Sequence, residues 1–212
     1  MKEVFTIGTS NIPGAVIIPH ILPEILKRDP NITLKLAVSN SQDTFEKVRL
    51  GQVQIGIIGT RFNSDDVNFL PVVHGDRLVL IAGKDHPLAK KQNFNLDDLK
   101  GQAFINREPG SGTRLTYETA FRQAGLPMDS FNILAEIAST EGVVEAVQSG
   151  AGLAVVSEVA VHQAVCCGDV VMLDLPFQME RDFYIITSNT HPLPSIARDL
   201  VNLLEDVLGQ RE

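Results

Sequence analysis

The sequence contains few of the residues that build metal centres, disulfides or aromatic ligand cages. Among its 212 residues there are 2 cysteines, 2 tyrosines, 5 histidines and no tryptophan. The histidines are scattered, without a partner at metal-ligand spacing. Their positions are His20, His74, His86, His162 and His191. We therefore predict no metal site and no cofactor.

The two cysteines, Cys166 and Cys167, are neighbours in the chain. Adjacent cysteines cannot link distant segments and rarely bond to each other, because the peptide between them would be strained. We interpret them as buried or half-buried thiols that end a helix. A redox or soft-metal role is the alternative.

Basic charge and long apolar runs are also lacking. The net charge is −8, and no cluster of lysine and arginine offers a local exception. The chain by itself is therefore not expected to bind nucleic acid. No apolar run is long enough for a signal sequence or a membrane span, so a cytoplasmic location is expected. With 44% hydrophobic residues, the chain can still bury a sizeable core.

Catalytic motifs are missing as well. The segment Gly110–Gly112 lacks the glycine spacing of a nucleophile elbow. Neither G-x-x-x-x-G-K nor G-x-G-x-x-G follows a predicted strand, which removes the main support for phosphate transfer or dinucleotide binding. The adjacent acids Asp65-Asp66 and Asp97-Asp98 are interpreted as loop or helix-start charges. No catalytic residue is predicted.

What the chain does have is a regular alternation of strand and helix patterns, which is typical of an α/β fold. The predicted strands are Val4–Gly8, Ile32–Val38, Ile55–Ile58, Phe69–Val73, Leu78–Ala82, Ala103–Asn106, Ile133–Ala138, Leu153–Val156, Val170–Leu173 and Phe183–Thr187. The predicted helices are one starting at Pro19 or Pro23, then Gln42–Leu50, Gly112–Ala124, Glu141–Gln148, Glu158–Val165 and Ser195–Leu208. The order of elements restarts after Lys84, which predicts two α/β lobes with largely parallel strands, the last helix returning to the first lobe.

Four predicted strand-to-helix loops are rich in hydroxyl groups and glycine. They are Gly8–Asn11, Ser39–Ser41, Pro109–Thr113 and Ser139–Gly142. Such loops can bind an anion, because the first amides of a helix are unpaired and carry partial positive charge. Helix capping alone is the alternative for each loop. A cleft that gathered loops of both lobes would favour ligand binding.

Two arginines bracket the third loop. Arg107 and Arg114 each offer a planar guanidinium that suits carboxylate, sulfate or phosphate oxygens, so they favour an anionic ligand. Glu108 lies between them in sequence and could pair with either one. Surface exposure of the arginines is the other interpretation.

Several motifs in order resemble the effector-binding domain of LysR-type transcriptional regulators. They are Ile7-Gly8-Thr9-Ser10, Ala37-Val38-Ser39, Leu50-Gly51-Gln52-Val53-Gln54-Ile55-Gly56-Ile57, His86-Pro87-Leu88-Ala89, the Arg107–Arg114 loop and Val147-Gln148-Ser149-Gly150-Ala151-Gly152-Leu153-Ala154. Each is weak alone, but together they cover essentially the whole chain. The Arg107–Arg114 loop is similar to one in members linked to inorganic sulfur or oxyanion metabolism.

The resemblance implies a fold like the type 2 periplasmic binding proteins, with two Rossmann-like lobes joined by two crossing strands. It places lobe I at 1–83 and 189–212 and lobe II at 84–188, with crossings near Gly83-Lys84 and Ser188-Asn189. It also implies homodimers, or tetramers in the full-length protein. DNA would be bound by a winged helix-turn-helix that is absent from this chain.

By the same resemblance, an effector would bind in the cleft between the lobes. The implied ligand-binding residues are Thr9, Ser10, Ser39, Asn40, Ser41, Thr60, Arg107, Glu108, Ser111, Gly112, Thr113, Arg114, Ser139 and Thr140. Few aromatic side chains are available to stack on a ring, so we expect a small oxyanion or carboxylate. The alternatives are a transporter's solute-binding protein and an enzyme of the same fold that uses Glu108 or Glu141 as acid or base.

Overall fold

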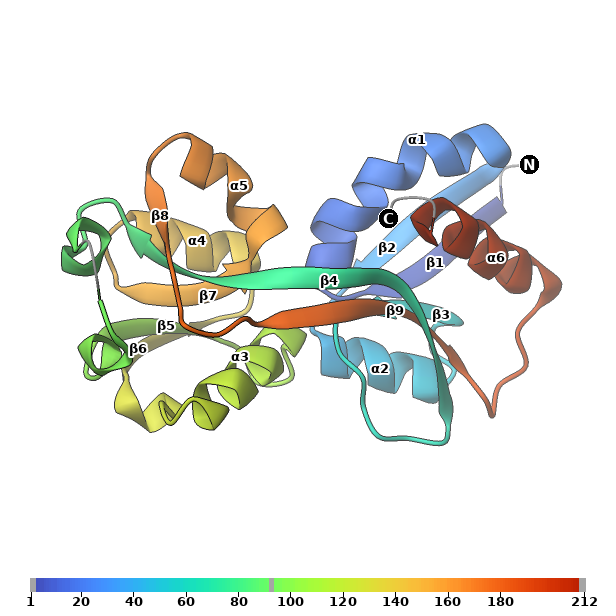
Figure 1. The fold of residues 1–212 in the computed structure, drawn as a ribbon. Coiled ribbons are helices and arrows are strands. Elements are labelled where there is room, and N and C mark those ends of the chain that lie inside the picture. The colour runs from blue at the N-terminus through green and yellow to red at the C-terminus, as the bar shows by residue number, and fades with distance from the viewer. Residues whose placement is uncertain (1–2, 92–93, 210–212) are drawn as a thin grey trace. The chain divides into compact units, whose positions relative to one another are not determined.

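The computed structural model describes residues 3–91 and 94–209 of the chain. The chain divides into two compact units, which we call unit 1 (residues 1–75 and 182–212) and unit 2 (residues 76–181). Each unit is an α/β structure with its own sheet and core (Figure 1). The α/β class predicted from the alternation of patterns is therefore confirmed.

Unit 1 contains both ends of the chain. Its elements are β1 (Glu3–Thr9), the π-helical turn η1 (Pro13–Ile17), α1 (Ile18–Arg28), β2 (Ile32–Val38), α2 (Ser41–Arg49), β3 (Ile55–Ile58), the first part of β4 (Val67–Gly83), the last part of β9 (Glu180–Ser188) and α6 (Ser195–Gly209). The strand order is β2-β1-β3-β9. β1 pairs in parallel with β2 and β3, and β9 pairs antiparallel with β3.

The core of unit 1 has two sides because successive side chains of a strand point to opposite faces of the sheet. Ile57 and Ile185 pack on the side of α1 and α6, together with Ile25 and Leu204. The next residues along the strands, Ile58 and Ile186, pack on the other side, where α2 supplies Phe45 and Val48. The C-terminal helix thus docks on the unit that contains the N-terminus, as its amphipathic pattern predicted.

Unit 2 is formed by the middle of the chain. Its elements are the rest of β4, η2 (Pro87–Lys90), η3 (Leu96–Leu99), β5 (Ala103–Arg107), α3 (Gly112–Gln123), η4 (Met128–Ser130), β6 (Asn132–Ile137), α4 (Thr140–Gln148), β7 (Leu153–Ser157), α5 (Glu158–Cys166), β8 (Val170–Leu173) and the start of β9. The strand order is β4-β7-β5-β6, and β8 pairs with β4. β5 is parallel to β6 and β7, whereas β4 is antiparallel to β7 and β8.

Two helices cover the two faces of the unit 2 sheet. Phe104 of β5 packs with Tyr117 and Phe121 of α3. The next residue, Ile105, packs on the opposite face with Val147 of α4. These packed layers hold the ends of β5 and the starts of α3 and α4 in place, and these are the segments that the sequence singled out.

Three details differ from the sequence predictions. The strands predicted at 69–73 and 78–82 are one strand, β4, which continues through Gly75 at a φ of 68°. The division between the units lies within β4 and β9, at 75/76 and 181/182, whereas the predicted crossings are near the C-terminal ends of these strands. Cys166 and Cys167 do end a helix, but both are exposed, so the prediction of buried or half-buried thiols is wrong. The reason is that Val161 is the buried residue of α5, and Cys166, which follows after more than one turn, lies about 140° around the helix from it.

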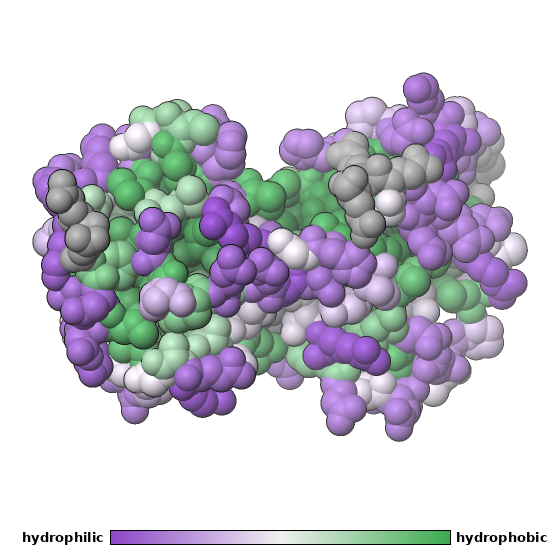
Figure 2. All heavy atoms as spheres, in the orientation of Figure 1, coloured by the Kyte–Doolittle hydropathy of each residue, from purple (hydrophilic) through white to green (hydrophobic). Residues whose placement is uncertain are grey.

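The surface carries mainly hydrophilic side chains on the face drawn in Figure 2, with smaller hydrophobic areas between them. Within residues 3–91 and 94–209, no helix has both the length and the apolar character that a membrane crossing requires.

Candidate functional site

The first group of predicted site residues lies at the strand ends of unit 1, and we call it the unit 1 loop set: Thr9, Ser10, Ser39, Asn40, Ser41 and Thr60. The amide of Ser39 donates to the carbonyl of Thr9 at 3.0 Å, and the amide of Ser10 donates to the carbonyl of Ile57 at 2.9 Å. These bonds bring together the carboxyl ends of β1, β2 and β3. Thr60 follows β3 and is half-buried. These residues therefore follow strand ends, as the pattern predicted, and their role in binding stays a prediction.

Some members of the unit 1 loop set serve as helix caps. The side-chain oxygen of Asn40 accepts from the amide of Asp43 at 2.8 Å, which starts α2. The capping interpretation thus holds for Asn40. The hydroxyl of Ser39 lies 2.9 Å from that of Thr44 and accepts from the ammonium of Lys47 at 3.2 Å. The sequence did not predict that Lys47 contacts this loop set, because a single lysine on a polar helix is not distinctive.

Thr9 stands apart from these capping residues. Its side chain is fully buried, and its hydroxyl oxygen has no hydrogen-bond partner among the described residues. A Cβ at Gly14 would lie 2.5 Å from that oxygen and 2.9 Å from Val38, so only glycine fits there. Burying a hydroxyl without a partner costs about 1–3 kcal/mol. The hydrogen bonds of the described residues do not offset this cost, and the ligand role of Thr9 stays a prediction.

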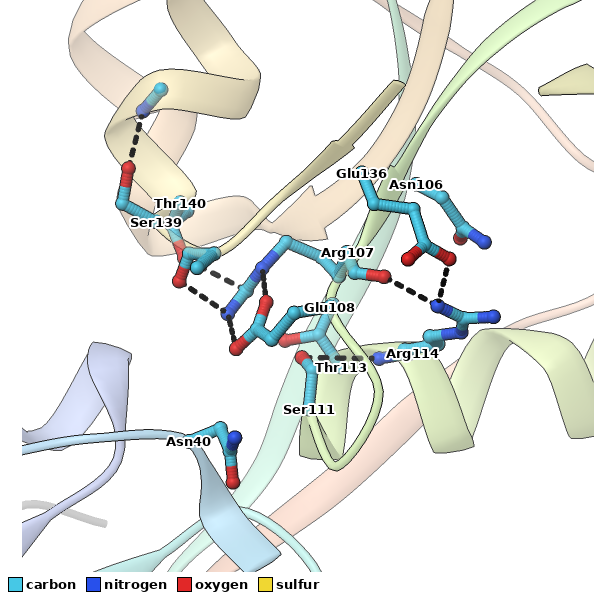
Figure 3. A network of polar contacts seen from close by, with 12 residues as sticks. Asn40, Asn106, Arg107, Glu108, Ser111, Thr113, Arg114, Glu136, Ser139 and Thr140 are labelled. Carbon is cyan, nitrogen blue, oxygen red and sulfur yellow. Dashed lines mark hydrogen bonds and ion pairs between the residues drawn. The ribbon is translucent and has the colours of Figure 1, made fainter. Parts of the chain in front are cut away.

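The second group lies in unit 2, and we call it the unit 2 loop set: Arg107, Glu108, Ser111, Gly112, Thr113, Arg114, Ser139 and Thr140. Its centre is Arg107, whose side chain is 3% exposed at the end of β5. The guanidinium donates to Thr140 Oγ1 at 3.1 Å and to the carbonyl of Ala138 at 3.4 Å (Figure 3). It also binds both carboxylate oxygens of Glu108, at 2.8 and 3.0 Å.

The caps of unit 2 repeat those of unit 1. Ser139 Oγ accepts from the amide of Gly142 at 3.1 Å and starts α4. Ser111 Oγ accepts from the amide of Arg114 at 3.5 Å, a long bond, and starts α3. The N-termini of α3 and α4 therefore both border the loop that carries Arg107. Their partial positive charge adds to that of the guanidinium.

Arg114 differs from Arg107 because it is held by two carboxylates. Its guanidinium donates to Glu118 at 2.7 Å, to Glu136 at 2.6 Å and to the carbonyl of Arg107 at 2.8 Å. Burial alone would lower the pKa of Arg114, but the bonds to the two glutamates raise it. This arginine braces the backbone of the loop, and its predicted direct contact with a ligand stays a prediction.

Sequence reasoning missed a buried ion pair in unit 2. Arg181 Nε donates to Asp76 Oδ2 at 2.8 Å, and the two side chains are 7% and 3% exposed. Arg181 Nη1 also donates to Thr113 Oγ1 at 3.0 Å, and Ser157 Oγ donates to Asp76 Oδ1 at 2.6 Å. The pair therefore joins β4, β9, β7 and the start of α3.

The electrostatics of that pair involve the loop set directly. Burial lowers the pKa of Arg181, Asp76 opposes this effect, and the charge of Arg107 lowers the pKa further. The positive charge of Arg107 thus acts on the buried Arg181, although each guanidinium also has a carboxylate partner. No local sequence pattern could have predicted this ion pair, because Asp76 and Arg181 are distant in sequence.

The hydroxyl of Tyr117 holds the end of β5 by two hydrogen bonds. It donates to the side-chain oxygen of Asn106 and accepts from the amide of Arg107 at 3.3 Å. Burial raises the pKa of Tyr117, so it remains a neutral hydrogen-bonding group. Together, hydroxyls, amides and guanidiniums can bind oxygen atoms of an anion. The described residues contain no group of three or more side chains suited to hold a metal ion.

Comparison with known proteins gives a consistent result. The sequence model of the LysR substrate binding domain matches residues 2–209. The HTH-type transcriptional regulator CysL of Bacillus subtilis is 30% identical over 90% of this chain, and the activator CmpR of Synechocystis is 29% identical over 90%. This chain spans 62% of the length of each of these relatives.

A solved structure supports the same assignment. The regulatory domain of CcmR from Synechocystis, in complex with 2-PG, is 26% identical, has a TM-score of 0.85, and the match covers 99% of both chains. The fold is therefore the type 2 periplasmic-binding-protein-like fold of LysR regulatory domains. This chain belongs to the LysR substrate-binding domain family.

Proposed function

We propose that this domain senses a small anion, which is bound through Arg107 of the unit 2 loop set. The observation that carries the anionic part is Arg107, a buried guanidinium placed beside the N-termini of α3 and α4. A buried cation that already has hydrogen bonds to Thr140 and Ala138 can bind an oxyanion without losing those bonds. In unit 1, the hydroxyl of Thr9, which has no hydrogen-bond partner among the described residues, is a separate candidate donor.

The chemistry of the comparison protein supports this ligand class. The CcmR domain binds 2-PG, 2-phosphoglycolate, which carries a phosphate and a carboxylate. In the present chain, neither loop set contains an aromatic side chain, and their polar groups are hydroxyls, one amide, two guanidiniums and the carboxylate of Glu108. We propose a small oxyanion or carboxylate for this chain.

The proposed mechanism is a shift between conformations. An anion that binds one arrangement of the two units more tightly than another stabilises that arrangement by its difference in binding free energy. In a longer protein that carries a helix-turn-helix part, as the names of the relatives describe, this shift would change DNA binding. We propose that the regulator acts in the cytoplasm as a homodimer and does no chemistry on its ligand. The family assignment favours this over the alternative of a transporter's solute-binding protein.

A thermal-denaturation screen tests the proposed ligand class. The panel is sulfate, sulfite, thiosulfate, phosphate, nitrate, 2-phosphoglycolate and small carboxylates, with sodium chloride at matched ionic strength as the control. An anion at a hundredfold excess over its dissociation constant adds about 2.7 kcal/mol to the free energy of unfolding, which raises the melting temperature. A panel in which every anion behaves like chloride would reject the proposed ligand class and leave the family assignment intact.

A further inference from the structure

Arg107 already forms an ion pair with a carboxylate of its own chain, that of Glu108. Glu108 places Oε2 at 2.8 Å from Nε of Arg107 and Oε1 at 3.0 Å from Nη2. Both acceptors thus lie on one edge of the guanidinium plane. This paired geometry is the strongest way for a guanidinium to bind a carboxylate, sulfate or phosphate. The edge best suited to an effector is therefore taken by Glu108.

We propose that Glu108 is an internal competitor for the effector, so that an anion must displace it to bind Arg107. This inference rests on the proposed function and changes the role of Glu108 from ligand contact to ligand substitute. Glu108 neutralises Arg107, so an incoming anion exchanges one ion pair for another. Anions with several charged oxygens would displace Glu108 more readily than singly charged ones, which makes Glu108 a determinant of specificity.

The surroundings of Glu108 allow it to leave. Its side chain is 15% exposed, against 3% for Arg107, so its carboxylate can turn into water while the guanidinium stays buried. Arg107 would keep its bonds to Thr140 and Ala138, which come from the other side of the loop set. The guanidinium therefore remains in position for the incoming anion.

In the second buried ion pair of unit 2, between Asp76 and Arg181, the carboxylate is held more firmly than in the first. Asp76 is 3% exposed, lies within β4 and accepts hydrogen bonds from Arg181 and Ser157. Its carboxylate is less exposed than that of Glu108 and is held by two side chains from different strands. Of these two buried arginines, Arg107 is the one whose carboxylate partner is free to be exchanged.

The test compares sulfate binding by the wild-type domain and by Glu108→Gln and Glu108→Ala, using isothermal titration calorimetry. Glutamine removes the charge and keeps one acceptor, and alanine removes both acceptors. We expect both variants to bind sulfate more tightly, the alanine variant by about tenfold or more, because the internal ion pair no longer competes. In sulfate-free buffer Glu108→Ala should melt below wild type, and sulfate should raise its melting temperature more than it raises that of wild type.

Two further variants make the test specific. Glu158→Gln breaks a similar two-bond ion pair, with Arg77, in the same unit, and it removes the same charge. It should leave the sulfate affinity within about twofold of wild type. Adding Arg107→Met to Glu108→Ala should abolish the gain, because the cation that receives the sulfate is then absent.

The outcomes separate this inference from the proposed function. Tighter binding by the Glu108 variants, lost with Arg107→Met, supports the inference. Sulfate binding by wild type that stays unchanged in both Glu108 variants overturns it and leaves the proposed function standing. An equal gain with Glu158→Gln also overturns it, since net charge would then explain the effect. Absence of sulfate binding in every variant and in wild type overturns the inference, and the full anion panel then decides the proposed function.

Discussion

The two loop sets occupy equivalent places at strand ends, yet their chemistry differs. The unit 1 loop set contains hydroxyls and one amide, and one of its hydroxyls, on Thr9, is buried without a partner among the described residues. The unit 2 loop set contains arginines that are already bound to carboxylates of the chain. A ligand oxygen that bound to the unit 1 loop set would therefore break no ion pair, whereas one that bound to a guanidinium of unit 2 would have to replace a carboxylate of the chain.

The largest expected effect on the free energy of unfolding comes from breaking the ion pair between Asp76 and Arg181 in unit 2. Asp76→Leu leaves Arg181 charged in a place where its side chain is 7% exposed. Removing one partner of a buried ion pair costs about 3–5 kcal/mol, and we expect a loss of that size in the free energy of unfolding from urea titrations.

A compensated variant provides the control for this prediction. Asp76→Leu combined with Arg181→Met replaces both charges with apolar groups and should recover most of the loss. A single variant as stable as wild type would show that the pair does not brace unit 2, and the contrast between the two loop sets would weaken.

The next effect separates helix capping from ligand binding. Asn40→Ala and Ser139→Ala each remove a cap, on α2 and α4 respectively. Each should lower the free energy of unfolding by about 0.5–2 kcal/mol without ligand present. Gln163→Ala, on the exposed face of α5, is the control and should stay within about 0.5 kcal/mol. Equal stabilities for all three variants would contradict the capping role in both units.

Thr9→Val should have a smaller effect on stability, and of opposite sign. Valine has nearly the shape of threonine and lacks the hydroxyl, which is buried with no partner in the part of the chain that the structure describes. We expect the free energy of unfolding to stay the same or rise by up to about 1 kcal/mol. Ser10→Ala, at the next position of the same loop set, serves for comparison. A clear loss of stability in Thr9→Val would show that the hydroxyl has a structural partner and is not reserved for a ligand.

The smallest effect is a pH dependence located in unit 2. Burial lowers the pKa of His86, whose Nδ1 accepts from the amide of Leu88. The unfolded chain then takes up a proton first, at a pKa of about 6.5, so stability is constant above that pH. It falls as the pH drops from there towards the lower pKa of the folded state. His86→Asn should remove this part of the slope between urea titrations at pH 7.5 and 5.5, and an unchanged slope would exclude His86 as its source.

The sequence predicted the strands and helices well because each has a clear period. Ile32–Val38 and Ile55–Ile58 are found as predicted, and α6 docks by the apolar stripe that the pattern showed. The merger of two predicted strands into β4 was missed for a physical reason. Its middle contains Gly75 and Asp76, residues typical of turns, and Asp76 is buried there only because Arg181 neutralises it.

The candidate site was predicted in part. The loops were found because hydroxyl residues at helix starts give a local signal, as at Ser39–Ser41 and Ser139-Thr140. The partners of the arginines were harder to predict, since ion-pair geometry depends on the fold. Glu108 was recognised as a partner for Arg107 or Arg114, and the structure pairs it with Arg107. Asp76 and Arg181 had no local signal at all.

The central claim, that the domain binds a small anion through Arg107, is tested most directly by the sulfate affinity of Arg107→Met, measured by isothermal titration calorimetry. We predict that this variant binds sulfate at least about tenfold more weakly than wild type, because it removes the buried guanidinium that receives the anion. The same measurement on Thr9→Val shows whether the hydroxyl of unit 1 also contributes. Wild-type affinity for sulfate in Arg107→Met would contradict the claim.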